Sequence, residues 1–393
     1  MSHMLNRRAA MRWTRATRTS LRVFLASLPF GCSGASSATS NPANLALHRD
    51  SAGIRLIEYR SLGGAPQLVL EKPALELGGL HNESDAEFDS RHPYLSAVTL
   101  SSGDIVVSDF ASLKFFGSDG RFLGRVGRAG AGPGEFQQTG SICRFAGDSV
   151  VVTSGDGRVS VWDGEGRHAR TLTRPGLMLP GCAAGVKLVQ GAFTSTEAGR
   201  FEAFYNVWRF DGTIVRTLGP LPATEFKGLL VYAPSILLIG DELIVADAQS
   251  FEIRTLGPDG ALRRIIRVLD GLRPVAESEW KGQIDGLVKG YRGSSSPRVL
   301  ARIESVRAHR PAHYPAHGRV LIDGADRIWV EDYDDRTTWT VFAASGALVG
   351  RVRLTQPGAE IAALDSLRAV VRWRDADGAL HLSFHDLTTL RPQ

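Results

Sequence analysis

Two short segments of the chain concentrate side chains that could bind a metal ion. The first holds four carboxylates within five residues: Glu331, Asp332, Asp334 and Asp335. Oxygen ligands of this kind hold hard cations such as calcium. The second, a few residues upstream, carries three histidines at four-residue spacing: His309, His313 and His317. Because imidazole favours zinc, one alternative is a calcium or zinc site that uses Asp332, Glu331 and His313.

Each segment also has an interpretation without a metal. Four-residue spacing aligns histidines on a helix, but Pro311 and Pro315 disrupt a regular helix there. In an extended chain, four residues span about 13 Å, which is too far for neighbouring ligands of one ion. Acidic clusters in loops are commonly just solvated, and no regular Asp-x-Asp-x-Asp-Gly calcium loop is present. We therefore predict no cofactor, with calcium or zinc kept as the alternative.

Two further aspartates follow β-rich runs, in VVSD (Asp109) and IVAD (Asp247). A carboxylate at the end of a strand can accept backbone N–H bonds from the next turn, so a structural role is predicted for both. The sequence shows no nucleophile elbow around a serine, no evident Cys–His pair and no phosphate-binding glycine loop. We predict no catalytic residue.

The elements that would position these residues are indicated by a repeat. Five glycines, each between two β-rich runs, recur along the chain: Gly120, Gly166, Gly212, Gly260 and Gly346. The first four are about 46–48 residues apart and the last gap is nearly twice as long. This period is typical of four-stranded propeller blades. Each glycine is predicted to adopt a positive φ in the hairpin between the two outer strands of a blade.

Six such repeats are found between residues 94 and 390, at about 43 residues per blade once one insertion is set aside. The predicted fold is therefore all-β, a six-bladed β-propeller over residues 53–393. The last repeat has only three strands of its own. Two β-like runs, 54–59 (IRLIEY) and 67–70 (QLVL), precede the first repeat, and a strand from residues 53–78 is predicted to close the ring and remove exposed edges.

The insertion, residues 275–309 between blades four and five, has helical spacing. Apolar residues from Trp280 to Tyr291 recur at intervals of three and four, and Ser296-Pro297 is a start signal for a second helix carrying Leu300, Ile303 and Val306. The helices either cover an apolar patch or form a wall or lid at the mouth of the propeller channel.

The first 31 residues contain six arginines, no acidic residue and a short apolar run, the layout of an export signal. Without them the formal charge falls from +5 to −1, so nothing favours nucleic acid as a partner.

Gly31-Cys32, followed by serines and alanines, resembles a bacterial lipoprotein signal, although Pro29 stands where the usual leucine would be. This resemblance implies lipidation of Cys32 and a membrane tether; the alternative is cleavage near Ala38. Residues 32–52 are predicted to be a flexible tether. The protein is expected in the periplasm or, held by lipid, at the membrane or cell surface.

The chain has three cysteines, Cys32, Cys143 and Cys182. If Cys32 carries lipid, the other two remain as a pair near the inner strands of adjacent blades, and an oxidising compartment would permit a disulfide between them. Two buried thiols are the alternative, because a disulfide requires Cα atoms about 4.4–6.8 Å apart.

After the first repeat the chain reads Gly-Ala-Gly-Pro-Gly-Glu-Phe, which includes Gly132, Gly134, Glu135 and Phe136. This segment resembles the linker of NHL-type propellers, and the V-x-D cores at Asp109 and Asp247 are similar to that repeat. The resemblance implies an exported bacterial six-bladed propeller, a group with many predicted lipoproteins of unassigned activity. It assigns these linker residues structural roles.

We therefore predict an exported cell-envelope propeller that acts as a binding or protein-interaction module. Its partner would be an envelope protein or a small ligand at one propeller face. The alternative is a metal-dependent lyase or lactone hydrolase with its site at the channel mouth. A ring of converging Asp, Glu, Asn and His side chains would favour the enzyme. A mouth that is apolar or lined by Arg and Tyr would favour binding.

Overall fold

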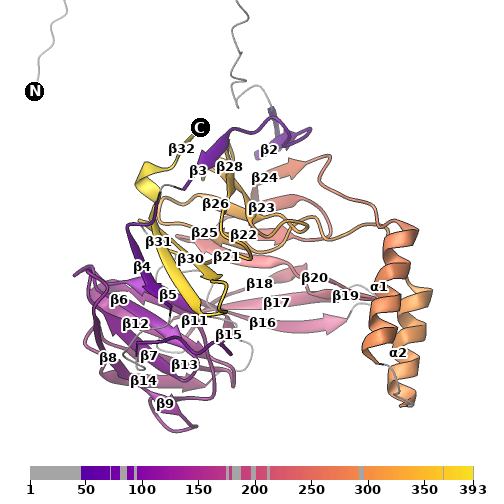
Figure 1. Cartoon of the computed structure of the whole chain (residues 1–393). Helices are drawn as coiled ribbons and strands as arrows, with labels where there is room; N and C mark the ends of the chain where they lie inside the picture. The colour runs from indigo at the N-terminus through magenta and orange to yellow at the C-terminus, as the bar shows by residue number, and fades with distance from the viewer. Residues whose placement is uncertain are drawn as a thin grey trace, which may run out of the picture. The chain divides into compact units, whose positions relative to one another are not determined.

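The computed structural model describes residues 46–392, apart from residues 71 and 366 and the segments 80–85, 93–94, 174–176, 179–186, 196–200, 210–212 and 292–295. Strands dominate these residues, and two α-helices, α1 (Glu277–Gly290) and α2 (Pro297–Ala308), lie between β24 and β25 in chain order (Figure 1). The expected signal segment, Cys32, Ala38 and most of the expected tether lie outside the described residues.

Six sheets of at least four strands are present in the described part of the chain. The first contains β5 (Ser96–Thr99), β6 (Ile105–Asp109), β7 (Ser112–Phe116) and β8 (Phe122–Val126). The second contains β11 (Thr139–Phe145), β12 (Ser149–Ser154), β13 (Arg158–Trp162) and β14 (His168–Thr173). The third contains β15 (Leu177–Met178), β16 (Lys187–Ser195), β17 (Phe201–Arg209) and β18 (Ile214–Pro222).

The fourth sheet is built from β21 (Ser235–Ile239), β22 (Glu242–Asp247), β23 (Glu252–Leu256) and β24 (Leu262–Val268). The fifth contains β25 (Val320–Ile322), β26 (Ile328–Glu331), β27 (Thr338–Phe342) and β28 (Leu348–Arg353). The sixth contains β29 (Glu360–Leu364), β30 (Arg368–Arg374), β31 (Leu380–Asp386) and β4 (Leu75–Gly78). Two short pairs lie between sheets: β9 (Arg128–Ala129) with β10 (Glu135–Phe136), and β19 (Glu225–Lys227) with β20 (Leu230–Tyr232).

The hairpin glycines have the predicted conformation. Gly120, Gly166, Gly260 and Gly346 have φ between +79° and +89°, in the turns that join the third and fourth strands of their sheets. At Gly346 a side chain would also collide with Ile57, because an added Cβ would lie 2.5 Å from its Cδ1 atom. Gly212 lies outside the described residues.

Within the described residues, five of the six pairs of neighbouring sheets pack face to face through apolar side chains. Separate buried clusters join the first sheet to the second, the third to the fourth, the fourth to the fifth and the fifth to the sixth. A further cluster joins the sixth sheet back to the first, through residues such as Phe384 and Val107. Trp329 and Trp339 are fully buried between the fifth and sixth sheets. Consecutive antiparallel sheets that pack in this way, with the last against the first, define a β-propeller.

The N-terminal strands correct one prediction. The sixth sheet is completed by β4, which pairs antiparallel with β31 (Figure 1). The more β-like runs lie elsewhere: β2 (Ile54–Tyr59) pairs in parallel with β24, and β3 (Gln67–Val69) pairs in parallel with β28 and antiparallel with β32 (Arg391–Pro392). The expectation that a segment within 53–78 closes the last sheet was right. The runs 54–59 and 67–70, however, extend the outer edges of two other sheets.

The predicted C-terminal bound of the flexible tether, residue 52, was wrong. Residues 46–51 form β1 (Ala46–Ser51), which pairs antiparallel with β2. The side chain of Tyr59 connects β2 to a different sheet. Its hydroxyl donates to the carbonyl of Gly346 at 2.9 Å and accepts the N–H of Leu348 at 2.7 Å, which ties β2 to the fifth sheet.

Two helices form where helical spacing was found. Trp280 and Ile284 of α1 and Val306 of α2 are buried against the β19–β20 hairpin, together with Tyr232. Leu300, which the pattern assigned to the packed face of α2, is instead 52% exposed. Among the described residues, no helix is long and apolar enough to cross a membrane.

Candidate functional site at the mouth of the central cavity

A cavity of about 1010 Å³ lies among the innermost strands of the propeller. Its lining comes from the first, second, fourth, fifth and sixth sheets, mostly from β11, β25 and β29 and their flanking residues. The cavity reaches the surface at exposed lining residues such as Ser141, Gly155 and Gly358. Its size is at the upper end of the range for small-molecule sites.

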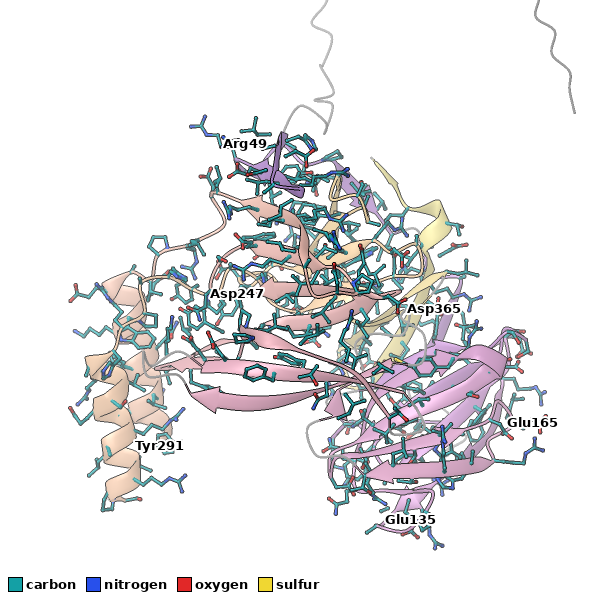
Figure 2. The ribbon with its side chains drawn as sticks, turned by 180° about the vertical axis from the view of Figure 1, so that it is seen from behind. Arg49, Glu135, Glu165, Asp247, Tyr291 and Asp365 are labelled. Atoms are coloured by element: carbon teal, nitrogen blue, oxygen red, sulfur yellow. The ribbon has the colours of Figure 1, made fainter. Side chains whose placement is uncertain are left out.

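The strand registers define one end of this cavity. In each hairpin, the start of the first strand lies opposite the end of the second: Ser96 opposite Ser108, Thr139 opposite Ser154, and Glu360 opposite Arg372. We call this end the mouth. The chain also passes from one sheet to the next here, so α1 and α2 emerge at the same end. Figure 2 shows Asp247, the last residue of β22, on the helix side of the molecule, and Asp365 away from it.

Four arginines line the mouth. Arg319 precedes β25, Arg336 lies in the loop between β26 and β27, and Arg372 and Arg374 end β30. Residues i and i+2 of a strand share one face, so Arg372 and Arg374 project to the same side of the sixth sheet. Two guanidinium groups from the fifth sheet and two from the sixth therefore line the same cavity.

Two carboxylates partly neutralise these arginines. Glu331, 3% exposed, binds Arg319 at 2.8 Å, and Glu360 binds Arg372 and lies 4.0 Å from Arg336. The guanidinium group of Arg374 is held differently, since it donates to the carbonyls of Ser90 at 2.7 Å and Gly378 at 2.9 Å. Within the described residues no carboxylate forms a salt bridge with Arg374. The mouth therefore carries more positive than negative charge.

The facing wall is polar but uncharged. It is formed mainly by the second sheet, with Gln138, Thr139, Ser141 and Thr153 among its lining residues. His92 also lines the cavity, and its Nε2 atom lies 3.2 Å from the Thr139 hydroxyl. Burial lowers the pKa of His92, and the nearby charge of Arg372 lowers it further. Because a lowered pKa favours the neutral imidazole, the positive charge of the mouth comes from arginine.

The acidic segment 331–335 does not converge on one point. Asp332 binds Arg351 at 3.0 Å and accepts the N–H groups of Asp334 and Asp335. Asp334 binds Arg273 at 2.7 Å. Asp335 accepts hydrogen bonds from Thr337, which lower the pKa of its carboxyl group. Each carboxylate of the candidate metal site is thus bound to a different cation or turn.

Each of the three histidines forms its own hydrogen bond with a nearby backbone carbonyl. The Nδ1 atoms of His309, His313 and His317 donate to the carbonyls of Ser305, Tyr314 and Gly318, at 2.8, 2.9 and 2.8 Å. Over the part of the chain that the structure describes, no three His, Cys, Asp or Glu side chains are grouped so that they could hold a metal ion. His313 is therefore not brought together with Glu331 and Asp332.

The two strand-end aspartates have different partners. Asp247 accepts the N–H of Gln249 in the next turn at 2.9 Å, as predicted. For Asp109 the predicted partner was wrong: its carboxylate accepts the N–H of Asp89 at 3.0 Å and binds Lys114 at 2.9 Å. Asp109 thereby holds the segment before β5 against the first sheet.

The linker residues pack locally. Glu135 accepts the N–H of Gly132 at 2.8 Å, and this bond lowers the pKa of its carboxyl group. Phe136 is fully buried and stacks on Trp162, with ring centroids 5.9 Å apart. Gly134 has a φ of +71°. These contacts are those of a structural connection between the first and second sheets.

Cys143 lies on β11, is buried and lines the cavity. Cys182 lies outside the described residues, so the disulfide stays a prediction.

The arginines of the mouth were not identified from the sequence. Their signal was present at the ends of second strands, where β6 and β22 end in aspartate and β26 in glutamate but β30 ends in Arg-Trp-Arg. Comparing the last residue of each second strand would have shown this change of charge. Arg336 carries no comparable signal, because it lies in a loop that is otherwise acidic.

No protein-family model matches the chain, and no curated protein matches it. Among solved structures, it is similar to a protein from Bacteroides fragilis, with 11% identity, a TM-score of 0.45 and coverage of 86% of this chain and 99% of that one. It is also similar to the β-propeller domain of Cps50 (Swd1) from Myceliophteria thermophila, with 10% identity, a TM-score of 0.39 and coverage of 74% and 96%. BamB from Moraxella catarrhalis has 11% identity, a TM-score of 0.33 and coverage of 79% and 85%. The fold class rests on the packing of the sheets themselves.

Proposed function

We propose that this protein is an exported, six-bladed binding module of the cell envelope that takes its ligand or partner at the mouth of the central cavity. Six blades are supported by the six sheets and by the cluster that packs the sixth against the first. The chain position of α1 and α2, between the fourth and fifth sheets, supports a helical insertion there. The packing of Glu135 and Phe136 is in keeping with an NHL-like linker.

Export is supported by the arginine-rich, acid-free start of the chain and the short apolar run after it. Gly31-Cys32 supports a lipid tether on Cys32 as part of the same proposal. The module would then face the periplasm or the cell surface.

The observation that carries the binding function is the composition of the mouth. The carboxylates there are bound to arginines, and the polar side chains of the lining carry mainly guanidinium, hydroxyl and amide groups. Such groups bind polar ligands by directed hydrogen bonds. A mouth of this composition favours recognition over the metal-assisted chemistry of the alternative.

A photoreactive side chain can test where the full-length protein makes contacts in its own host. One variant carries a benzophenone residue in place of Ser141, an exposed lining residue, and its control carries one in place of Glu165. Glu165 lies in the β13–β14 turn, at the end of the second sheet opposite the mouth, because Trp162 pairs with Val150 at the start of β12 (Figure 2).

We expect illumination of cells to give a discrete covalent adduct with the residue at 141 and none at 165, as measured by the mass of the purified chain and by gel mobility. Adducts at 165 with none at 141 would place the contact surface on the opposite face and contradict the proposal.

A further inference from the structure

We propose that the ligand of this cavity is a small, hydroxylated organic molecule with one oxyanion group, either a carboxylate or a phosphate. Arg336 and Arg374 would bind this group. The inference rests on the proposed binding function and names the chemical class that the mouth would select.

The charges of the arginines and carboxylates at the mouth do not balance. Arg319 and Arg372 each bind a carboxylate directly, through Glu331 and Glu360. Arg336 has only a 4.0 Å approach to Glu360 and is 70% exposed. Arg374 binds two carbonyl oxygens, which carry no charge to neutralise its own. Two guanidinium groups are therefore left for an anion from outside, and guanidinium matches carboxylate and phosphate oxygens in geometry and charge.

The arginines of β30 are pre-organised. The carbonyls of Ser90 and Gly378 hold the guanidinium group of Arg374 in place before a ligand arrives. Arg372, on the same face of β30, is fixed by Glu360 directly across the strand pair. A side chain held in advance loses less conformational entropy on binding, so this wall favours a ligand with a fixed anionic group.

The side chains opposite the arginines indicate what the rest of the ligand would be. Across the cavity, Gln138, Ser141 and Thr153 offer amide and hydroxyl groups instead of charges. Burial lowers the pKa of His92, which favours its neutral form. Hydroxyl groups on the ligand would be matched by these side chains, whereas a second cationic group would not. The volume of about 1010 Å³ accommodates a molecule of this type.

The experiment measures binding of three probes to the full-length protein by titration calorimetry: citrate, inorganic phosphate and the neutral polyol sorbitol. The variants are Arg374→Gln and Arg336→Gln. Arg336→Gln should not disturb folding, because the Arg336 side chain is largely exposed. Arg167→Gln serves as the control, since Arg167 is 73% exposed in the β13–β14 turn, away from the mouth.

Saturable binding of citrate or phosphate is expected, with an affinity that falls about tenfold or more in either mouth variant and is unchanged in Arg167→Gln. Citrate binding alone would identify a carboxylate and phosphate binding alone a phosphate group. Affinity should also fall with added salt, because the charges are partly exposed.

A gain-of-binding variant separates recognition from a structural role. Glu360→Gln releases Arg372 from its carboxylate, so the anion should bind several-fold more tightly. Equal affinity for the anions in wild type and both mouth variants, or binding of neither anion, would overturn the inference. If sorbitol alone binds, or if adducts form at residue 141 equally with and without Arg336 and Arg374, the binding function stands and only the anionic ligand is wrong.

Discussion

Leu77→Asp is expected to lower the free energy of unfolding by about 4 kcal/mol, because it places a charge in the strand that completes the sixth sheet. Leu77 lies on β4, is 5% exposed and pairs with Leu382 of β31. Its side chain belongs to the cluster that packs the sixth sheet against the first. Loss of β4 would therefore open the propeller at the place where its last sheet meets its first.

The matched control is Leu47→Asp on β1. Leu47 is 51% exposed on a strand that only extends the outer edge of the fourth sheet. We expect a change of about 0.5 kcal/mol or less. Urea unfolding of both variants measures the difference, and equal destabilisation would show that β4 does not close the propeller.

Asp109→Ala is expected to cost about 3–5 kcal/mol of stability, because it leaves the ammonium group of Lys114 buried without its carboxylate. The side chains are 4% and 6% exposed, and the ion pair measures 2.9 Å. Lys114 also donates to the carbonyl of Glu87, and Asp109 accepts the N–H of Asp89, so the pair anchors residues 87–89 to the first sheet.

Removing both charges tests this explanation. In the double variant Asp109→Ala, Lys114→Met no buried charge is left alone, so more than half of the lost stability should return. Chemical unfolding of both single variants and the double variant gives the coupling. A small effect of Asp109→Ala, with no recovery in the double variant, would remove the ion pair from the account of this segment.

The repeat could be predicted from the sequence because it depends on the backbone conformation of single residues in the hairpins. A positive φ is required in each outer hairpin, and glycine tolerates it, so the glycines recur at the length of one blade. Helical spacing between Trp280 and Tyr291 was readable for the same reason, since one face of α1 is buried. These signals depend on residues close in the chain.

The closing strand could not be read in this way. The run at Leu75–Gly78 has four residues and ends in a glycine, whereas IRLIEY has a much stronger β pattern. Pairing with β31, about 300 residues away, decides its role, and at Gly78 an added Cβ would lie 2.2 Å from the carbonyl oxygen of Leu380. The glycine that weakens the sequence signal is required by the close approach of the two strands.

The candidate site could not be predicted either, because the partners of its residues are distant in the sequence. The sequence pointed to the acidic segment 331–335, because four carboxylates stand together there. Their partners, Arg273, Arg319 and Arg351, come from distant parts of the chain and turn the cluster into separate ion pairs. Only the assembled sheets show that arginines from the fifth and sixth sheets line the mouth, while the carboxylates of the acidic segment are bound to other partners.

We propose that the mouth recognises a ligand with arginines and does not hold a catalytic metal ion. The most direct test is the metal content of the full-length protein purified without chelator, measured by elemental mass spectrometry together with that of Asp332→Ala. We expect substoichiometric calcium and zinc in both proteins, because Asp332 is bound to Arg351 and to the backbone of its own turn. Stoichiometric calcium or zinc in the wild type, lost in Asp332→Ala, would contradict the account and favour a metal-dependent lyase or lactone hydrolase.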